Sequence, residues 1–123
     1  YNSDFKPGFW YVETHFKVDK NFKNITDIAK YLKIIENFQH KSSVLIFNKV
    51  PKEKAIDKNL IQNWIELSID RAKELDIAGK DLTPFLISEI NSLSQNKSLD
   101  ANTALIVNNA LLAGKIAKNF SLV

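Results

Sequence analysis

The spacing of apolar residues changes near Asp57, and this change most constrains how the 123-residue chain can fold. From Asp57 to Leu75, apolar and small side chains recur every three or four residues, with charged residues mostly between them. This spacing is that of an amphipathic helix with one buried face. The same period continues beyond it, so two further helices are expected, one over residues 85–93 and one over residues 98–120.

The expected starts of the two later helices rest on capping residues. Thr83 precedes Pro84, which fits an N-cap followed by a proline whose missing N–H costs little in the first helical turn. Thr83 is therefore explained as a cap rather than as an active hydroxyl. Ser98 or Asp100 would cap the last helix, whose many Ala and Gly residues permit close packing against a neighbour.

The amino-terminal half contains two segments with the composition of strands. Residues 9–16 are aromatic and β-branched, and residues 43–47 form a continuous apolar run typical of a strand buried on both faces. A helix capped by Asn24 or Thr26 is expected between them. Its apolar face would carry Ile28, Ala29, Leu32, Ile35 and Phe38.

Strand, helix and strand within about forty residues indicate a βαβ unit with a right-handed crossover. The predicted fold class is therefore α/β. It is a partial layered α/β/α sandwich in which the βαβ unit is followed by three covering helices. No linker or low-complexity tract divides the chain, so residues 1–123 are expected to form a single structural unit.

Composition excludes several classes of function. The 17 Lys and Arg include only Arg71 as arginine and alternate with acidic residues, which indicates a solvated surface rather than a nucleic-acid site. No apolar run is long enough to span a membrane. The chain has no Cys, which excludes thiolate sites and fits a cytoplasmic location. It also has no Met, which suggests a segment of a longer chain. His15 and His40 stand alone, so no metal site is expected.

Three asparagines are the candidate binding residues. Asn102 and Asn109 are seven residues apart, nearly on one face of the last predicted helix. They either hydrogen-bond the backbone of a neighbouring loop or face a ligand, and the residues alone favour the first interpretation. Asn48 follows the predicted buried strand, at the sheet edge where open α/β sheets bind ligands, although it could equally stabilise a turn.

The carboxy-terminal third resembles a known family. Thr83-Pro84-Phe85-Leu86-Ile87 leads through Ser98-Leu99-Asp100-Ala101-Asn102 into Ala104-Leu105-Ile106-Val107-Asn108-Asn109-Ala110. This order and spacing is similar to the carboxy-terminal end of pseudouridine-5′-phosphate glycosidases, the indigoidine synthase A-like family. The resemblance implies pseudouridine catabolism by reversible, lyase-type cleavage of the C–C glycosidic bond of pseudouridine 5′-phosphate, which yields uracil and ribose 5-phosphate.

The resemblance also implies Mn²⁺ and a homotrimer for the intact parent. The family's catalytic lysine and glutamate and its metal-binding aspartate lie upstream, so this segment is expected to hold no catalytic residue and no metal ligand. Asn102 matches the family's substrate-side asparagine, with Asn109 and Asn48 as further substrate-binding candidates on one wall of the site. The chain departs from the family pattern at Val12 to His15 and at Lys49. These departures leave open a catalytically silent homologue with a structural or assembly role.

Overall fold

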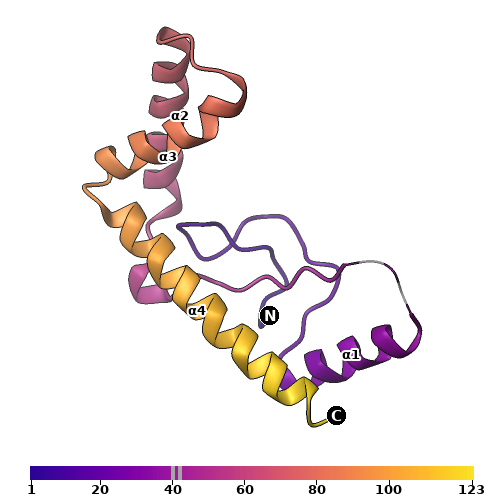
Figure 1. Ribbon diagram of the computed structural model, residues 1–123. Coiled ribbons are helices and arrows are strands. Elements are labelled where there is room, and N and C mark those ends of the chain that lie inside the picture. The colour runs from indigo at the N-terminus through magenta and orange to yellow at the C-terminus, as the bar shows by residue number, and fades with distance from the viewer. Residues whose placement is uncertain (40, 42) are drawn as a thin grey trace.

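A computed structural model describes residues 1–39, 41 and 43–123. Within these residues the chain is helical apart from long irregular segments in its first half (Figure 1). The elements are α1 (Ile25–Asn37), the 3₁₀ helix η1 (Lys52–Lys54), α2 (Lys58–Glu74), the 3₁₀ helix η2 (Gly79–Asp81), α3 (Leu82–Leu93) and α4 (Lys97–Phe120).

Helix α4 is the axis around which the other elements are arranged. Helices α2 and α3 pack together beyond its amino-terminal end, and α1 lies against its carboxy-terminal end (Figure 1). The irregular segments of the first half lie along one side of α4. Two buried clusters form against this helix. One joins Ile28 of α1 to Leu112 and Ile116, and the other joins Val50 of the irregular segment before η1 to Ala101 and Leu105.

The predicted α/β class is wrong for the described residues, which contain no β-strand and therefore no βαβ unit. Residues 9–16 fold back on their own neighbours. The Lys6 N–H donates to the carbonyl of Phe16 (2.7 Å), and the Thr14 N–H donates to the carbonyl of Lys6 (2.8 Å). A single antiparallel bridge joins Phe5 and Lys17. The β-type composition therefore produces a local loop rather than a strand of a parallel sheet.

Residues 43–47 are also not the buried strand that their apolar run predicts. Val44 is 39% exposed and Leu45 is 76% exposed. The carbonyl of Phe47 accepts a hydrogen bond from the amine of Tyr1 (2.6 Å). This single bond does not form the repeated hydrogen-bond ladder of a β-sheet. A strand needs a partner strand for its backbone N–H and C=O groups. No partner strand lies beside this segment among the described residues. Its apolar composition is therefore not sufficient to make it a strand.

The helix between these segments forms as expected. The side chain of Asn24, rather than Thr26, caps α1 by accepting a hydrogen bond from the Asp27 N–H (2.8 Å). Ile28 and Ala29 are buried, but Phe38 follows the helix and is 82% exposed, so its predicted place on the buried face is wrong.

The three helices of the second half form as predicted, but two of their predicted caps are wrong. Helix α3 begins at Leu82, so Thr83 already lies within its first turn. Helix α4 begins at Lys97, ahead of both Ser98 and Asp100. The start of α4 is capped from outside the helix, because the hydroxyl of Ser94 accepts a hydrogen bond from the Ser98 N–H (3.1 Å).

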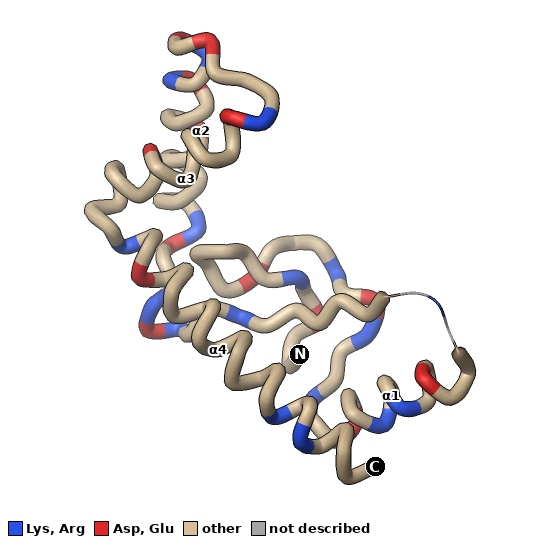
Figure 2. Tube along the Cα trace, viewed as in Figure 1, with Lys and Arg blue, Asp and Glu red and all other residues tan. Residues whose placement is uncertain are grey.

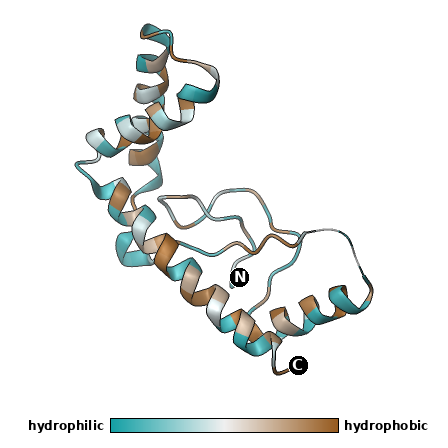
Figure 3. Cartoon of the chain, viewed as in Figure 1, coloured by the Kyte–Doolittle hydropathy of each residue, from teal (hydrophilic) through white to brown (hydrophobic). Residues whose placement is uncertain are grey.

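The surface mixes charges of both signs with apolar side chains. Figure 2 shows Lys, Arg, Asp and Glu distributed over the helices and the irregular segments. Figure 3 shows hydrophobic residues recurring along α4. Some of them, Ile106, Val107 and Leu111, point away from the buried clusters and are more than half exposed. None of the helices in the described part of the chain combines the length and apolar character needed to cross a bilayer.

Candidate functional site

Asn102 lies on the second turn of α4 and lines a hollow of about 790 Å³ between the irregular first half and helices α2, α3 and α4. Most of the lining is apolar. It includes Phe9, Trp10, Ile65, Pro84, Leu86, Ile90 and Leu99. The Asn102 side chain is half-buried, and the described residues give its carboxamide no hydrogen bond. The expected hydrogen bond to the backbone of a neighbouring loop is therefore not found among them.

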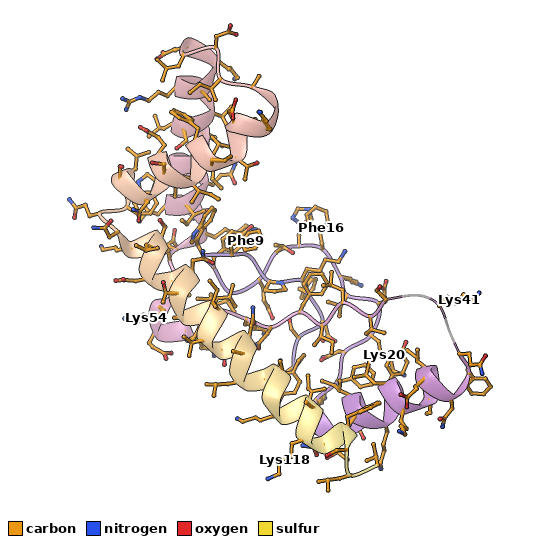
Figure 4. The ribbon with its side chains drawn as sticks, in the orientation of Figure 1. Phe9, Phe16, Lys20, Lys41, Lys54 and Lys118 are labelled. Atoms are coloured by element: carbon orange, nitrogen blue, oxygen red, sulfur yellow. The ribbon has the colours of Figure 1, made fainter. Side chains whose placement is uncertain are left out.

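Aromatic side chains form one wall of this hollow. The rings of Phe9 and Trp10 meet edge to face, with their centroids 6.2 Å apart. Figure 4 places Phe9 where the irregular segments approach the start of α4. Aromatic faces with a few convergent polar groups are typical of pockets for small planar ligands.

Further polar groups of the hollow come from α3 and its connection to α4. Thr83, Ser88 and Ser98 lie on its lining, so Thr83 reaches the site although it is not a cap. Asn91 also lies there and was not singled out in the sequence. Its side-chain amide donates to the Oδ1 of Asn96 (3.0 Å), while its own Oδ1 is buried and has no partner among the described residues.

Asn109 and Asn48 meet at a different hollow. This second space, of about 660 Å³, lies between α1, α4 and the segment before η1. Asn109 is exposed, whereas Asn48 is partly buried and its Oδ1 accepts from the N–H of Lys49 (3.1 Å). The Nδ2 of Asn48 is buried and has no partner in the described part of the chain. The structure thus places Asn48 and Asn109 on the lining of the same hollow.

Asn102 is not part of that pair. Two helical turns separate it from Asn109, about 10 Å along the axis of α4. The two side chains therefore share a face of the helix but open into different hollows. Between them, Asn108 donates from its Nδ2 to the carbonyl of Lys49 (3.0 Å). Sequence reasoning missed this structural contact, because the two residues are 59 positions apart.

Glu13 and Lys49 form an ion pair. The Oε1 of Glu13 accepts hydrogen bonds from the Lys49 ammonium (2.5 Å) and from the Ser3 hydroxyl (2.5 Å). These bonds, that from Lys49 first, hold the pKa of the Glu13 carboxyl below its usual range. Two of the residues that depart from the family pattern, Glu13 and Lys49, are therefore in contact with each other.

The described residues do not gather three His, Asp or Glu side chains at one place, so they offer no fit to the implied Mn²⁺. His15 is exposed, and its ring lies 4.0 Å from that of Phe16. His40 lies outside the described residues. The polar groups at the Asn102 hollow are carboxamides and hydroxyls beside an apolar wall.

Relatives of known name cover the whole chain. The chain is 37% identical over 123 residues to the pseudouridine-5′-phosphate glycosidase of Petrotoga mobilis. The aligned part covers all of this chain and 40% of that relative. The chain is 40% identical over 111 residues to the pseudouridine-5′-phosphate glycosidase of Caldanaerobacter subterraneus. Here the aligned part covers 90% of this chain and 36% of the relative. The chain thus spans about 40% of the length of the curated relatives it matches.

The fold also has a solved counterpart. The prealnumycin C-glycosynthase AlnA, solved in complex with ribulose 5-phosphate, superposes with a TM-score of 0.90 at 18% identity. The match covers 99% of this chain and 40% of that one. The model of the indigoidine synthase A-like family matches residues 1–119. The chain therefore belongs to the family of indigoidine synthase A-like proteins.

Proposed function

We propose that this chain is part of a pseudouridine-5′-phosphate glycosidase and supplies one wall of its substrate site. The complete enzyme reversibly cleaves the C–C glycosidic bond of pseudouridine 5′-phosphate to uracil and ribose 5-phosphate. The observation that carries the proposal is the half-buried carboxamide of Asn102, which has no hydrogen-bond partner among the described residues and lies at an apolar, aromatic hollow. The relatives are named pseudouridine-5′-phosphate glycosidases, and the bond cleaved and the products are those that the family resemblance implies.

The hollow suits the base of this substrate better than its phosphate. A pyrimidine is planar, and its N–H and C=O groups match both halves of a carboxamide. The aromatic and aliphatic lining would pack against the faces of the ring. No Lys or Arg lines the hollow, so a phosphate would find no cation there. Asn109 and Asn48 stay as further candidates for the substrate at the second hollow.

The remaining chemistry belongs to residues outside this chain. Since the described residues offer no site for Mn²⁺, we propose that the metal, the catalytic lysine and the general acid are all provided by the rest of the enzyme. A homotrimer and a cytoplasmic location are likewise part of the proposal. Within this scheme, the residues of the Asn102 hollow bind and orient the base while the bond to the sugar breaks.

A catalytically silent homologue is the second candidate, and one observation favours it. The loop at residues 12–15, which departs from the family pattern, is occupied by internal contacts. Glu13 bonds to Lys49, and the hydroxyl of Thr14 donates to the carbonyl of Lys6 (2.8 Å). If that loop contacts the substrate in active members, these internal contacts would keep its side chains from doing so here.

Uracil release by the complete protein separates the two candidates. The wild type should release uracil from pseudouridine 5′-phosphate in the presence of Mn²⁺. Asn102→Ala should lower kcat/KM about tenfold or more, because it removes a hydrogen bond to the substrate. A contribution of about 1.4 kcal/mol from that bond corresponds to a factor of about ten. Asn63→Ala, on an exposed face of α2, is the matched control and should keep the wild-type rate. A folded wild-type protein that releases no uracil would favour the silent homologue.

A further inference from the structure

The aromatic wall of the Asn102 hollow is carried by a loop rather than by a helix. Trp10 packs against the buried cluster of Val50, Ala101 and Leu105 while also lining the hollow. Its carbonyl accepts a hydrogen bond from the N–H of Ile56 (2.6 Å). Local backbone hydrogen bonds and the bridge between Phe5 and Lys17 fold this loop back on itself, whereas its position against α4 is set by tertiary contacts.

One such contact lies three residues after Trp10. Glu13 accepts from the Lys49 ammonium and from the hydroxyl of Ser3, both at 2.5 Å. Ser3 is buried, and its backbone N–H donates a hydrogen bond to the Oδ1 of Asn21 (3.0 Å). The carboxylate of Glu13 is thus fastened on two sides, from two different parts of the chain.

Lys49 is itself fixed to α4. Its carbonyl accepts from Asn108 of that helix (3.0 Å), and the next residue, Val50, is only 1% exposed. Lys49 therefore connects two structures: its backbone is held against α4, and its ammonium reaches the loop that carries Trp10. The side chains of Lys49 and Glu13 are 29% and 39% exposed, so water screens the pair only in part.

We propose that Glu13 and Lys49 are positioning residues whose ion pair closes the loop of residues 8–16 onto α4 and thereby fixes Trp10 in the wall of the Asn102 hollow. The pair does not touch the substrate. The effect on the loop stands on the contacts alone, and only its consequence for turnover rests on the proposed function.

The first test reads the position of Trp10 directly. The complete protein is prepared with Trp64, and any tryptophan outside these 123 residues, replaced by Phe, so that Trp10 alone fluoresces. Lys49→Met and Glu13→Gln should each shift the emission to longer wavelength and raise the acrylamide quenching constant about twofold. Lys49→Arg should stay near the wild type. Lys73→Met is the matched control, because Lys73 pairs with Asp70 on the exposed face of α2.

The double variant Glu13→Gln/Lys49→Met makes the test specific to the pair. It should change the fluorescence no more than either single variant, because each single change already breaks the same contact. The exchanged pair Glu13→Lys/Lys49→Glu should recover part of the wild-type emission, and it keeps the test decisive should a single variant fold poorly. Unchanged quenching in both single variants, or fully additive changes in the double variant, would overturn the proposal.

Kinetics then measure the consequence for the site. Lys49→Met should raise KM for pseudouridine 5′-phosphate several-fold and leave kcat within about twofold, since Trp10 contributes to binding rather than to bond cleavage. An unchanged KM in a variant whose Trp10 fluorescence has shifted would overturn the link to the site. If no form of the protein releases uracil, the proposed function fails, while the fluorescence still decides whether the pair holds Trp10.

Discussion

Residues 1–56 and residues 58–120 are held in shape by different kinds of contact. The second region consists mainly of helices, whose backbone hydrogen bonds join residues close in sequence. The first region contains α1 and η1 but is otherwise irregular. Its fixed points join distant residues, as Lys49 does with Glu13 and with Asn108 of α4.

The comparison bears on function because the Asn102 hollow takes its walls from both regions. Asn102 and Thr83 come from helices that form by local rules, whereas Phe9 and Trp10 come from a loop that depends on α4. A change in the buried core of a helix should therefore act mainly on stability. A change in the loop should act mainly on the shape of the hollow.

The largest expected effect is a loss of stability in the helical region. Ile61 is fully buried on α2, and Ile61→Ala should lower the free energy of unfolding by about 2–5 kcal/mol, through lost burial and the cavity left behind. Urea denaturation of the protein measures this effect. Leu67→Ala, at a 59% exposed position on the same helix, is the control and should cost far less. Equal losses for the two variants would contradict the packing of α2 described here.

A glycine-to-alanine pair contrasts the two regions directly. A Cβ on Gly8 would come within 2.8 Å of the far end of the Tyr11 ring, so Gly8→Ala should push this ring aside and cost about 1 kcal/mol, at the low end for overpacking. Gly114 lies within α4 with no atom within 4 Å of an added Cβ. Gly114→Ala should stabilise the helix by about 0.5–1 kcal/mol. Urea denaturation of both variants should give changes of opposite sign, and a neutral Gly8→Ala would show that the Tyr11 ring moves aside at no cost.

The same contrast shows how much of the structure can be predicted from the sequence. The helices could be predicted, because their period is a local property. The caps could be predicted only in part, since Asn24 does cap α1 but Thr83, Ser98 and Asp100 lie inside the helices that they were expected to cap. The strands could not. Their composition is that of strands, but a strand forms only with a partner, and residues 9–16 instead fold back while residues 43–47 find no ladder among the described residues.

The candidate site was predictable to a similar degree. The positions of Asn102 and Asn109 on one helical face follow from their spacing, but that they open into different hollows depends on what packs beside each turn. The contact between Glu13 and Lys49 spans 36 positions, and no local pattern encodes it. Asn91 gave no signal, because its exposure to the hollow depends on how α3 meets α4.

The smallest expected effect is a pH dependence confined to the loop region. The pKa of Glu13 is lowered, so its stabilising contribution is present above the pKa of an unfolded glutamate, about 4.3, and is lost as the pH falls through the lower folded value. Lys49, Ser3 and the more distant Lys52 are the groups that favour the charged form. Glu13→Gln should flatten this part of the pH dependence in urea denaturation, while Glu66→Gln, on the exposed face of α2, should not.

The most direct test of the account measures the binding of uracil, the product whose ring the Asn102 hollow is proposed to hold. Isothermal titration calorimetry of the complete protein needs no turnover and no metal-dependent step. Asn102→Ala should bind uracil about tenfold more weakly than the wild type, and Asn63→Ala should bind it equally well. Equal affinity in Asn102→Ala and the wild type would contradict the assignment of this hollow to the base.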